Sequence, residues 1–127
     1  MTDLHDSALG KAVAYPSAYD PALLHPIARS HARAALGVGD ELPFTGVDVW
    51  NAYELGWLDA RGKPKVALAE FRVPAASPNL VESKSLKLYL ASHHQVRYAD
   101  TETLRALLAH DLSAAAGAAV SAVITPV

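Results

Sequence analysis

Apolar and polar residues alternate from Val47 onward with the two-residue period of a strand. The apolar positions share one parity, which Asn51 interrupts: Val47, Val49, Tyr53, Leu55 and Trp57. Asp48 and Glu54 have the opposite parity. This alternation is typical of a half-buried strand, so the five apolar side chains are predicted to share one face.

A turn and a second strand follow this segment. The sequence Asp-Ala-Arg-Gly-Lys at residues 59–63 predicts a turn in which Gly62 takes a positive φ. Residues 65–73 then alternate again, with Glu70 and Arg72 on one face. The other face carries Ala67, Ala69, Phe71 and Val73. The two strands are predicted to pair as a hairpin.

Two helices and a last strand are predicted beyond the hairpin. Pro74 and Pro78 end the hairpin, and Asn79 is predicted to cap a helix over about residues 80–93. Asp100 or Thr101 is predicted to begin a second helix, which Gly117 ends before a strand over residues 120–127. The apolar stripe of this second helix consists of Leu104, Leu107, Leu108 and Leu112.

The first 42 residues show no steady period. Proline follows Tyr15, Asp20 and His25, which favours extended or turn geometry at each position. Residues 1–42 are therefore predicted to form an irregular arm, apart from a possible helical turn over residues 29–36. Residues 43–127 are predicted to form one α+β module in the order strand, strand, helix, helix, strand, with one sheet edge left unpaired.

Composition narrows the possible functions of the chain. The net charge of -2 over 127 residues provides neither the basic surface expected of a nucleic-acid binder nor attraction to anionic membranes. The absence of cysteine excludes disulfides, thiolate zinc sites and a thiol nucleophile. No apolar run approaches the roughly 20 residues of a membrane helix. The first ten residues do not resemble a signal peptide, so a cytoplasmic location is expected.

Residues 80–90 concentrate the chemically active side chains. Glu82 could accept two hydrogen bonds from an amino-pyrimidine edge, and Ser83 could contact the reacting end of a ligand. Lys84 is suited to a phosphate. The alternative is structural: Glu82 is then an acid favoured by the helix dipole, and the lysines form a solvated face.

The octapeptide Glu-Ser-Lys-Ser-Leu-Lys-Leu-Tyr at residues 82–89 resembles the signature of the NADPH-dependent 7-cyano-7-deazaguanine reductases. The resemblance extends from about residue 15 to residue 123 and is to the long, two-module branch of the family. Further matching segments are residues 19–24, 42–50, 53–58, 62–64, 77–80 and 110–113.

This resemblance implies a tunnelling fold, in which an antiparallel sheet backed by two antiparallel helices assembles with other copies into a barrel. It implies reduction of the nitrile of 7-cyano-7-deazaguanine to an aminomethyl group in queuosine modification of transfer RNA. By position, Val81, Glu82 and Ser83 would bind the deazaguanine, and Ser83 and Lys84 would contact NADPH.

The chain also departs from the family pattern. In the long branch the nucleophilic cysteine, the proton-donating aspartate and further ligand contacts lie in a second module. This chain ends at residue 127, before such a module would begin. We therefore expect no catalytic residue in this chain, a missing C-terminal module as its partner, and homo-oligomerisation.

Parts of the sequence are also compatible with other functions. His93 and His94 would point about 100° apart on a helix, which does not suit one metal ion, and no metal site is predicted. Glu54 and Glu70 could form a catalytic carboxylate pair, although sheet-surface charges are the commoner arrangement. The chain could also be a non-catalytic ligand-binding or assembly module, or another tunnelling-fold enzyme acting on a purine or pterin.

Overall fold

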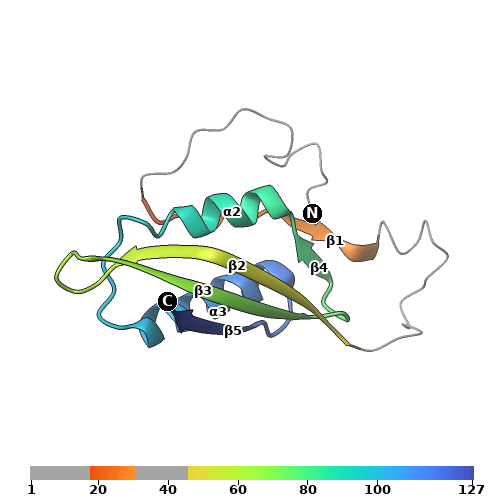
Figure 1. Ribbon diagram of the computed structural model, residues 1–127. Coiled ribbons are helices and arrows are strands. Elements are labelled where there is room, and N and C mark those ends of the chain that lie inside the picture. Colours follow the sequence, from red (N-terminus) through yellow and green to blue (C-terminus); the bar gives the residue numbers. More distant parts are fainter. Residues whose placement is uncertain (1–17, 31–45) are drawn as a thin grey trace.

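In the computed structural model, which describes residues 18–30 and 46–127, a three-stranded antiparallel sheet carries two helices (Figure 1). Its strands, in spatial order, are β2 (Val47–Leu58), β3 (Pro64–Pro74) and β5 (Ser121–Pro126). The helices are α2 (Ser83–Ala91) and α3 (Thr101–Ala116). A smaller antiparallel sheet pairs β1 (Pro26–Ala28) with β4 (Asn79–Val81), and a short 3₁₀ helix, η2 (Pro21–Leu23), precedes it. The predicted α+β class is confirmed.

The hairpin of β2 and β3 forms as its sequence predicts. Trp50 lies opposite Phe71 in the antiparallel register. At the turn, the Asp59 carboxylate accepts the backbone N–H groups of Arg61 at 2.9 Å and Lys63 at 3.0 Å. Gly62 has a φ of 84°, so a residue without a Cβ relieves the strain of this turn.

The predicted face of β2 is wrong over its first half because the strand contains a bulge. Ala52 pairs with Ala69, but the next pair joins Leu55 to Ala67, so β2 contains one extra residue. Leu55 and Trp57 are buried as expected, whereas three residues of the same parity are exposed: Val47, Val49 and Tyr53. The extra residue exchanges the two faces of the strand, as a shift of one residue must.

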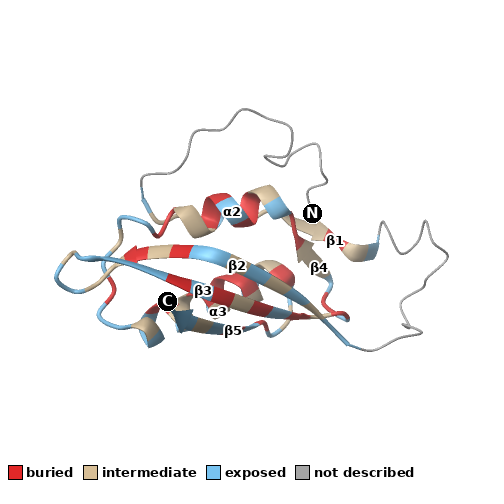
Figure 2. Ribbon diagram, in the orientation of Figure 1, coloured by how far each residue is buried: buried red, intermediate tan, exposed pale blue. Residues whose placement is uncertain are grey.

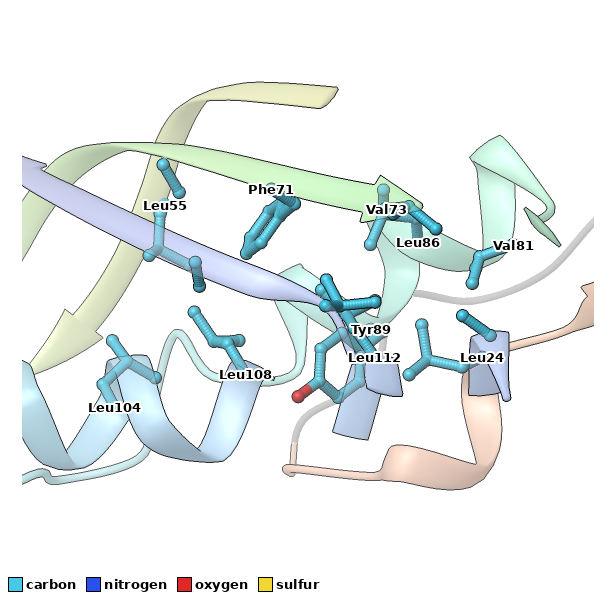
Figure 3. Close-up of a cluster of buried hydrophobic side chains, with 14 of the residues drawn as sticks. Leu24, Leu55, Phe71, Val73, Val81, Leu86, Tyr89, Leu104, Leu108 and Leu112 are labelled. Carbon is cyan, nitrogen blue, oxygen red and sulfur yellow. The ribbon is translucent and has the colours of Figure 1, made fainter. Parts of the chain in front are cut away.

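The hydrophobic core lies between the sheet and the two helices (Figures 2 and 3). The predicted inner face of β3 is confirmed, and Phe71 is 1% exposed at its centre. From the helices, Tyr89 on α2 and Leu104 and Leu108 on α3 are fully buried. The opposite sheet face retains exposed apolar side chains: Val47, Val49, Val66, Leu68 and Val123.

Helix α3 matches its predicted bounds, but α2 begins later than predicted. Asp100 caps α3 by accepting the Thr103 N–H at 2.8 Å, and Gly117 ends it at a φ of 75°. Asn79 does not cap α2, since residues 79–81 form β4 and pair with β1. This pairing with a distant segment delays the start of α2 to Ser83.

The described part of the N-terminal arm is more ordered than its composition predicts. It contains η2 and β1, which the prediction of an irregular arm missed. Residues 29 and 30 are helical, as predicted for the start of a helical turn. The remainder of that turn and the boundary predicted between residues 42 and 43 lie outside the described residues.

Candidate functional site

The four candidate residues 81–84 occupy the junction at which β4 ends and α2 begins. Val81 is the last residue of β4, where it lies opposite Pro26 of β1. Its side chain is 6% exposed and belongs to the hydrophobic core. The structure therefore places Val81 as a packing residue of the core, and the ligand contact expected of it stays a prediction.

Glu82 is the N-cap of α2. Its Oε2 atom accepts the Lys84 N–H at 2.6 Å and its Oε1 atom accepts the Ser85 N–H at 3.1 Å. The Glu82 N–H in turn donates to the His25 carbonyl oxygen at 3.0 Å. The residue is only 4% exposed. The structural role considered for Glu82 at the helix start is thus present, and its carboxylate satisfies two of the free N–H groups of the first turn.

Two hydroxyls follow Glu82 in very different surroundings. Ser85 is buried, and its hydroxyl donates to the Glu82 carbonyl at 2.7 Å and accepts the His25 N–H at 3.0 Å. Ser83 is exposed and borders a groove of about 430 Å³ between α2 and β2. Of these two hydroxyls, Ser83 is the one open to a ligand.

The groove also brings together residues that the sequence analysis did not assign to a site. From α2 and the turn after it come Lys87 and His94, and from β2 come Trp50 and Tyr53. The four-residue interval between Ser83 and Lys87 was a signal that they share one face of a helix, whereas His94 lies beyond the end of α2 and no helical spacing indicated it. The volume of the groove lies in the range of small-molecule sites, and its lining offers aromatic faces, a hydroxyl, an ammonium and an imidazole.

The structure does not support the other catalytic groupings that the sequence allowed. Glu70 is engaged on the sheet surface by Arg72, with Nε at 3.1 Å from Oε2, whereas Glu54 borders the groove. His93 is buried and His94 is exposed. Within residues 18–30 and 46–127, no cluster of three or more histidine, aspartate or glutamate side chains is placed to hold a metal ion.

A buried polar network under α2 is a feature that sequence reasoning missed. The Oδ2 atom of Asp111 on α3 accepts the hydroxyl of Tyr19 and that of Tyr89, each at 2.6 Å. Burial raises the pKa of both tyrosines well above the usual value of 10, and the hydrogen bonds to Asp111 raise it further. The network joins the N-terminal segment, α2 and α3 at one oxygen atom.

His93 completes this network. Its Nδ1 atom lies 2.5 Å from the Tyr98 hydroxyl, and its ring packs edge-on against Tyr89 with centroids 5.0 Å apart. Burial lowers the pKa of His93 from 6.5 to about 4, and the nearby Asp111 charge only partly opposes this. Burial also raises the pKa of Tyr98 to about 12. The three tyrosines and His93 are therefore neutral near pH 7.

Comparisons with a family model and with individual proteins indicate the same family. A family model described as "Nitrile reductase, 7-cyano-7-deazaguanine-reductase N-term" matches residues 15–124. Proteins named "NADPH-dependent 7-cyano-7-deazaguanine reductase" are 62% identical over 117 residues in Bordetella avium and 61% identical over 121 residues in an Azoarcus species. These alignments cover 92% and 94% of this chain but 43% of each relative. The chain thus spans less than half the length of these curated relatives.

Proposed function

The chain belongs to the family of N-terminal modules of 7-cyano-7-deazaguanine nitrile reductases, and we propose that it works as the first module of such an enzyme. The complete enzyme would reduce the nitrile of 7-cyano-7-deazaguanine to an aminomethyl group with NADPH, as a step in transfer-RNA modification. The observation that carries this proposal is the position of the octapeptide at residues 82–89. It begins α2, with Ser83 opening into the groove beside β2.

In this proposal Glu82 recognises the amino-pyrimidine edge of the deazaguanine. The carboxylate already accepts one backbone N–H at each oxygen, and a carboxylate oxygen has lone pairs for a second bond. The helix cap thus fixes the direction of the carboxylate before a ligand arrives. Because Glu82 is 4% exposed, hydrogen bonds to it would form away from bulk water, where they discriminate strongly between ligands.

The residues around Ser83 fit a dinucleotide cofactor. Ser83 and Lys84 lie in the first turn of α2, where the helix dipole and the Lys84 ammonium favour a phosphate. Lys87 places a cation at the groove, and the aromatic side chains of Trp50 and Tyr53 offer faces for a planar ring. NADPH would supply hydride. The role of this chain would be to bind and orient the cofactor and the deazaguanine.

The nucleophile would come from a second module. The 127 residues include no cysteine, and a hydroxyl without a neighbouring base is a far weaker nucleophile than a thiolate. The Ser85 hydroxyl is further restricted because it is held by Glu82 and His25. The same observations favour the second candidate function, a ligand-binding and assembly module that has no turnover of its own.

Assembly is part of the proposal. Among the described strands, none pairs with the outer edge of β2 or of β5, and the helix-free face of the sheet exposes five large apolar side chains. Unpaired edges and apolar faces favour association with further sheet. We therefore propose that this module joins a second module and further copies in a closed barrel.

A cytoplasmic location is proposed as well, since the reaction would consume NADPH. Within the described residues, no helix is long and apolar enough to span a membrane.

The test combines the 127-residue chain with 7-cyano-7-deazaguanine and NADPH, with and without a separately produced second module from one of the relatives. The chain alone is expected to form no covalent adduct, as judged by intact mass, and to leave the NADPH absorbance unchanged. Addition of the second module is expected to restore both signals. A stoichiometric adduct on the chain alone would show that the nucleophile lies within these 127 residues.

A further inference from the structure

The segment from Tyr19 to Arg29, which we call the strap, follows the whole length of α2 (Figure 1). Near the C-terminal end of the helix, the Asp20 N–H donates to the Ser92 hydroxyl at 3.3 Å. Near the N-terminal end, the His25 N–H donates to the Ser85 hydroxyl at 3.0 Å. The strap then pairs with β4 through β1. Its contacts therefore extend from the last turn of α2 to the segment that enters the helix.

The strap fixes the backbone of the proposed ligand residue. The His25 carbonyl oxygen accepts the Glu82 N–H at 3.0 Å, and Pro26 lies opposite Val81 in the β1–β4 pair. The two carboxylate bonds of Glu82 hold its side chain against α2, but only the strap holds its N–H. The position of Glu82 relative to the groove therefore depends on a segment nearly sixty residues earlier in the chain.

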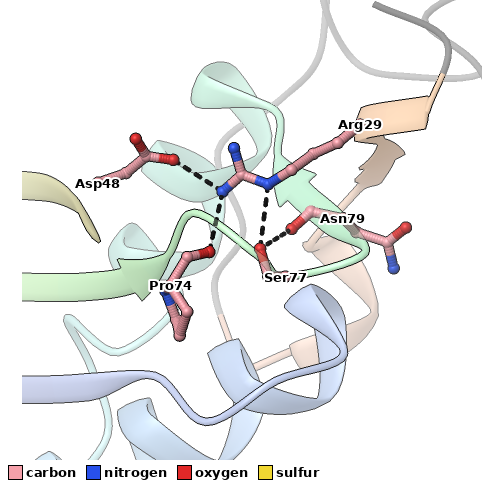
Figure 4. A network of polar contacts seen from close by, with 5 residues as sticks. All are labelled: Arg29, Asp48, Pro74, Ser77 and Asn79. Carbon is pink, nitrogen blue, oxygen red and sulfur yellow. Dashed lines mark hydrogen bonds and ion pairs between the residues drawn. The ribbon is translucent and has the colours of Figure 1, made fainter. Parts of the chain in front are cut away.

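Side-chain contacts anchor the strap at both ends. At one end, the Tyr19 hydroxyl donates to Asp111 at 2.6 Å. At the other, the Arg29 guanidinium lies 2.7 Å from the Asp48 carboxylate and donates to the Ser77 hydroxyl at 3.1 Å (Figure 4). The Arg29 side chain is 11% exposed and Ser77 is fully buried, so water competes weakly for the bond between them, whereas the Asp48 side chain is 45% exposed. Both anchors involve a charged group, which makes them stronger than neutral hydrogen bonds.

We infer that Tyr19 and Arg29 are positioning residues for the Glu82 site. They act through the strap, whose His25 carbonyl holds the Glu82 N–H. Neither side chain borders the groove at Ser83, so neither is assigned a contact with the ligand. The inference depends on the proposed function only for the identity of the ligand that the Glu82 site binds. The coupling between the two anchors and Glu82 is a property of the chain itself.

Hydrogen exchange of the 127-residue chain, followed by NMR, tests the coupling without any ligand. Tyr19→Phe removes one anchor hydrogen bond, and Arg29→Lys removes the forked geometry of the other anchor. Each is expected to accelerate exchange of the Glu82 N–H about tenfold or more, because the strap opens more often. Exchange in β3 is expected to stay within about twofold. Arg105→Lys is the matched control, because it alters an exposed ion pair with Glu102 on α3 that does not contact the strap.

Two exchange results would overturn the inference. One is unchanged exchange at Glu82 in both strap variants. The other is equal acceleration at Glu82 and in β3, which would mean that the anchors contribute only to global stability. The use of one variant at each end keeps the test decisive if either substitution prevents folding.

A kinetic measurement on the chain combined with its second module adds the functional readout. Tyr19→Phe is expected to raise KM for 7-cyano-7-deazaguanine about three- to tenfold and to change kcat less than twofold, since a displaced Glu82 weakens binding. A fall in kcat with unchanged KM would overturn the positioning role. If the wild-type pair shows no turnover, the proposed function fails, and the exchange result still decides whether the strap positions Glu82.

Discussion

The Nδ1 atom of His93 lies 2.5 Å from the hydroxyl of Tyr98, in a part of the core that solvent does not reach. The other ring nitrogen, Nε2, is buried and has no hydrogen-bond partner among the described residues. A neutral imidazole can be buried there at a smaller cost in free energy than a protonated one. A protonated ring would place a charge and an unpaired N–H donor in the same apolar surroundings.

We expect this arrangement to make the chain less stable in mild acid. The pKa of His93 is lowered to about 4 in the folded chain, whereas the ordinary value of 6.5 applies to the unfolded chain. Below pH 6.5 the unfolded chain thus binds a proton that the folded chain does not. The contribution of His93 to stability is complete above pH 6.5 and is lost as the pH falls toward 4, by about 2 kcal/mol between pH 7 and pH 5.

Urea denaturation at pH 7 and pH 5 measures this difference. His93→Gln is expected to remove most of the loss, because glutamine does not titrate. His94→Gln is the matched control: it removes the exposed neighbouring histidine and is expected to leave the loss in place. An unchanged pH dependence in His93→Gln would assign the effect to another group.

The proposed ligand-binding role of Glu82 can be separated from its role as helix cap by two substitutions in a complete two-module enzyme. Glu82→Ala is expected to weaken deazaguanine binding by about 2–4 kcal/mol, because donors on the ligand lose their acceptor. It should also destabilise the start of α2 by about 1 kcal/mol. Glu82→Gln keeps the shape and one acceptor oxygen, so it should retain more of the cap and still lose affinity. Calorimetric titration and thermal unfolding measure the two effects, and unchanged affinity in both variants would leave Glu82 as a helix cap alone.

The exposed sheet face is expected to drive self-association of the 127-residue chain. Val123 lies on the edge strand β5 and is 53% exposed. Val123→Lys should shift the chain toward monomer in sedimentation experiments, because a solvated charge opposes burial of this face. Ala114→Lys, at an exposed position of α3, should leave the association unchanged. A wild-type chain that is monomeric at high concentration, with residues 120–127 protected from exchange, would contradict this expectation.

A prediction about the hydrophobic core compares the loss of stability on truncating two residues of β3. Phe71 is 1% exposed, and Phe71→Ala is expected to lower the free energy of unfolding by about 3–5 kcal/mol through lost burial and a new cavity. Leu68 faces the other side of the sheet and is 42% exposed, so Leu68→Ala should cost less than about 1 kcal/mol. Chemical denaturation of the two variants checks the difference, and equal losses would mean that the two faces are misassigned.

The C-terminal end of α3 allows a test of backbone strain at a positive φ. Gly117 has a φ of 75°, and a Cβ atom there would lie 3.2 Å from Cγ of Pro78. Gly117→Ala is expected to destabilise the chain by about 1–2 kcal/mol, because a residue with a Cβ is strained in this conformation. Gly117→Asn should cost less, since asparagine tolerates positive φ more readily. Thermal unfolding measures both, and an Ala variant as stable as the Asn variant would contradict the argument.

The amino-acid sequence by itself predicts those features of this protein that depend on local geometry. The hairpin, the turn at Gly62, the bounds of α3 with its Asp100 cap and Gly117 end, and the inner face of β3 are all predicted by local patterns. The octapeptide at residues 82–89 likewise indicates the family, because it is a continuous run of residues. A period of two or 3.6 residues reports the repeat of one strand or helix, so it needs no knowledge of what the element packs against.

The face of β2, the start of α2 and the ordering of the strap depend instead on tertiary contacts. The bulge between Ala52 and Leu55 exposes Val49, although its parity matches that of buried Leu55. Residues 79–81 form a strand because β1 pairs with them, which makes Glu82 the cap. Tyr19 is held by a carboxylate 92 residues away. These features arise from contacts between distant segments, and no local period records such contacts, because their free energy is gained only when the whole chain has folded.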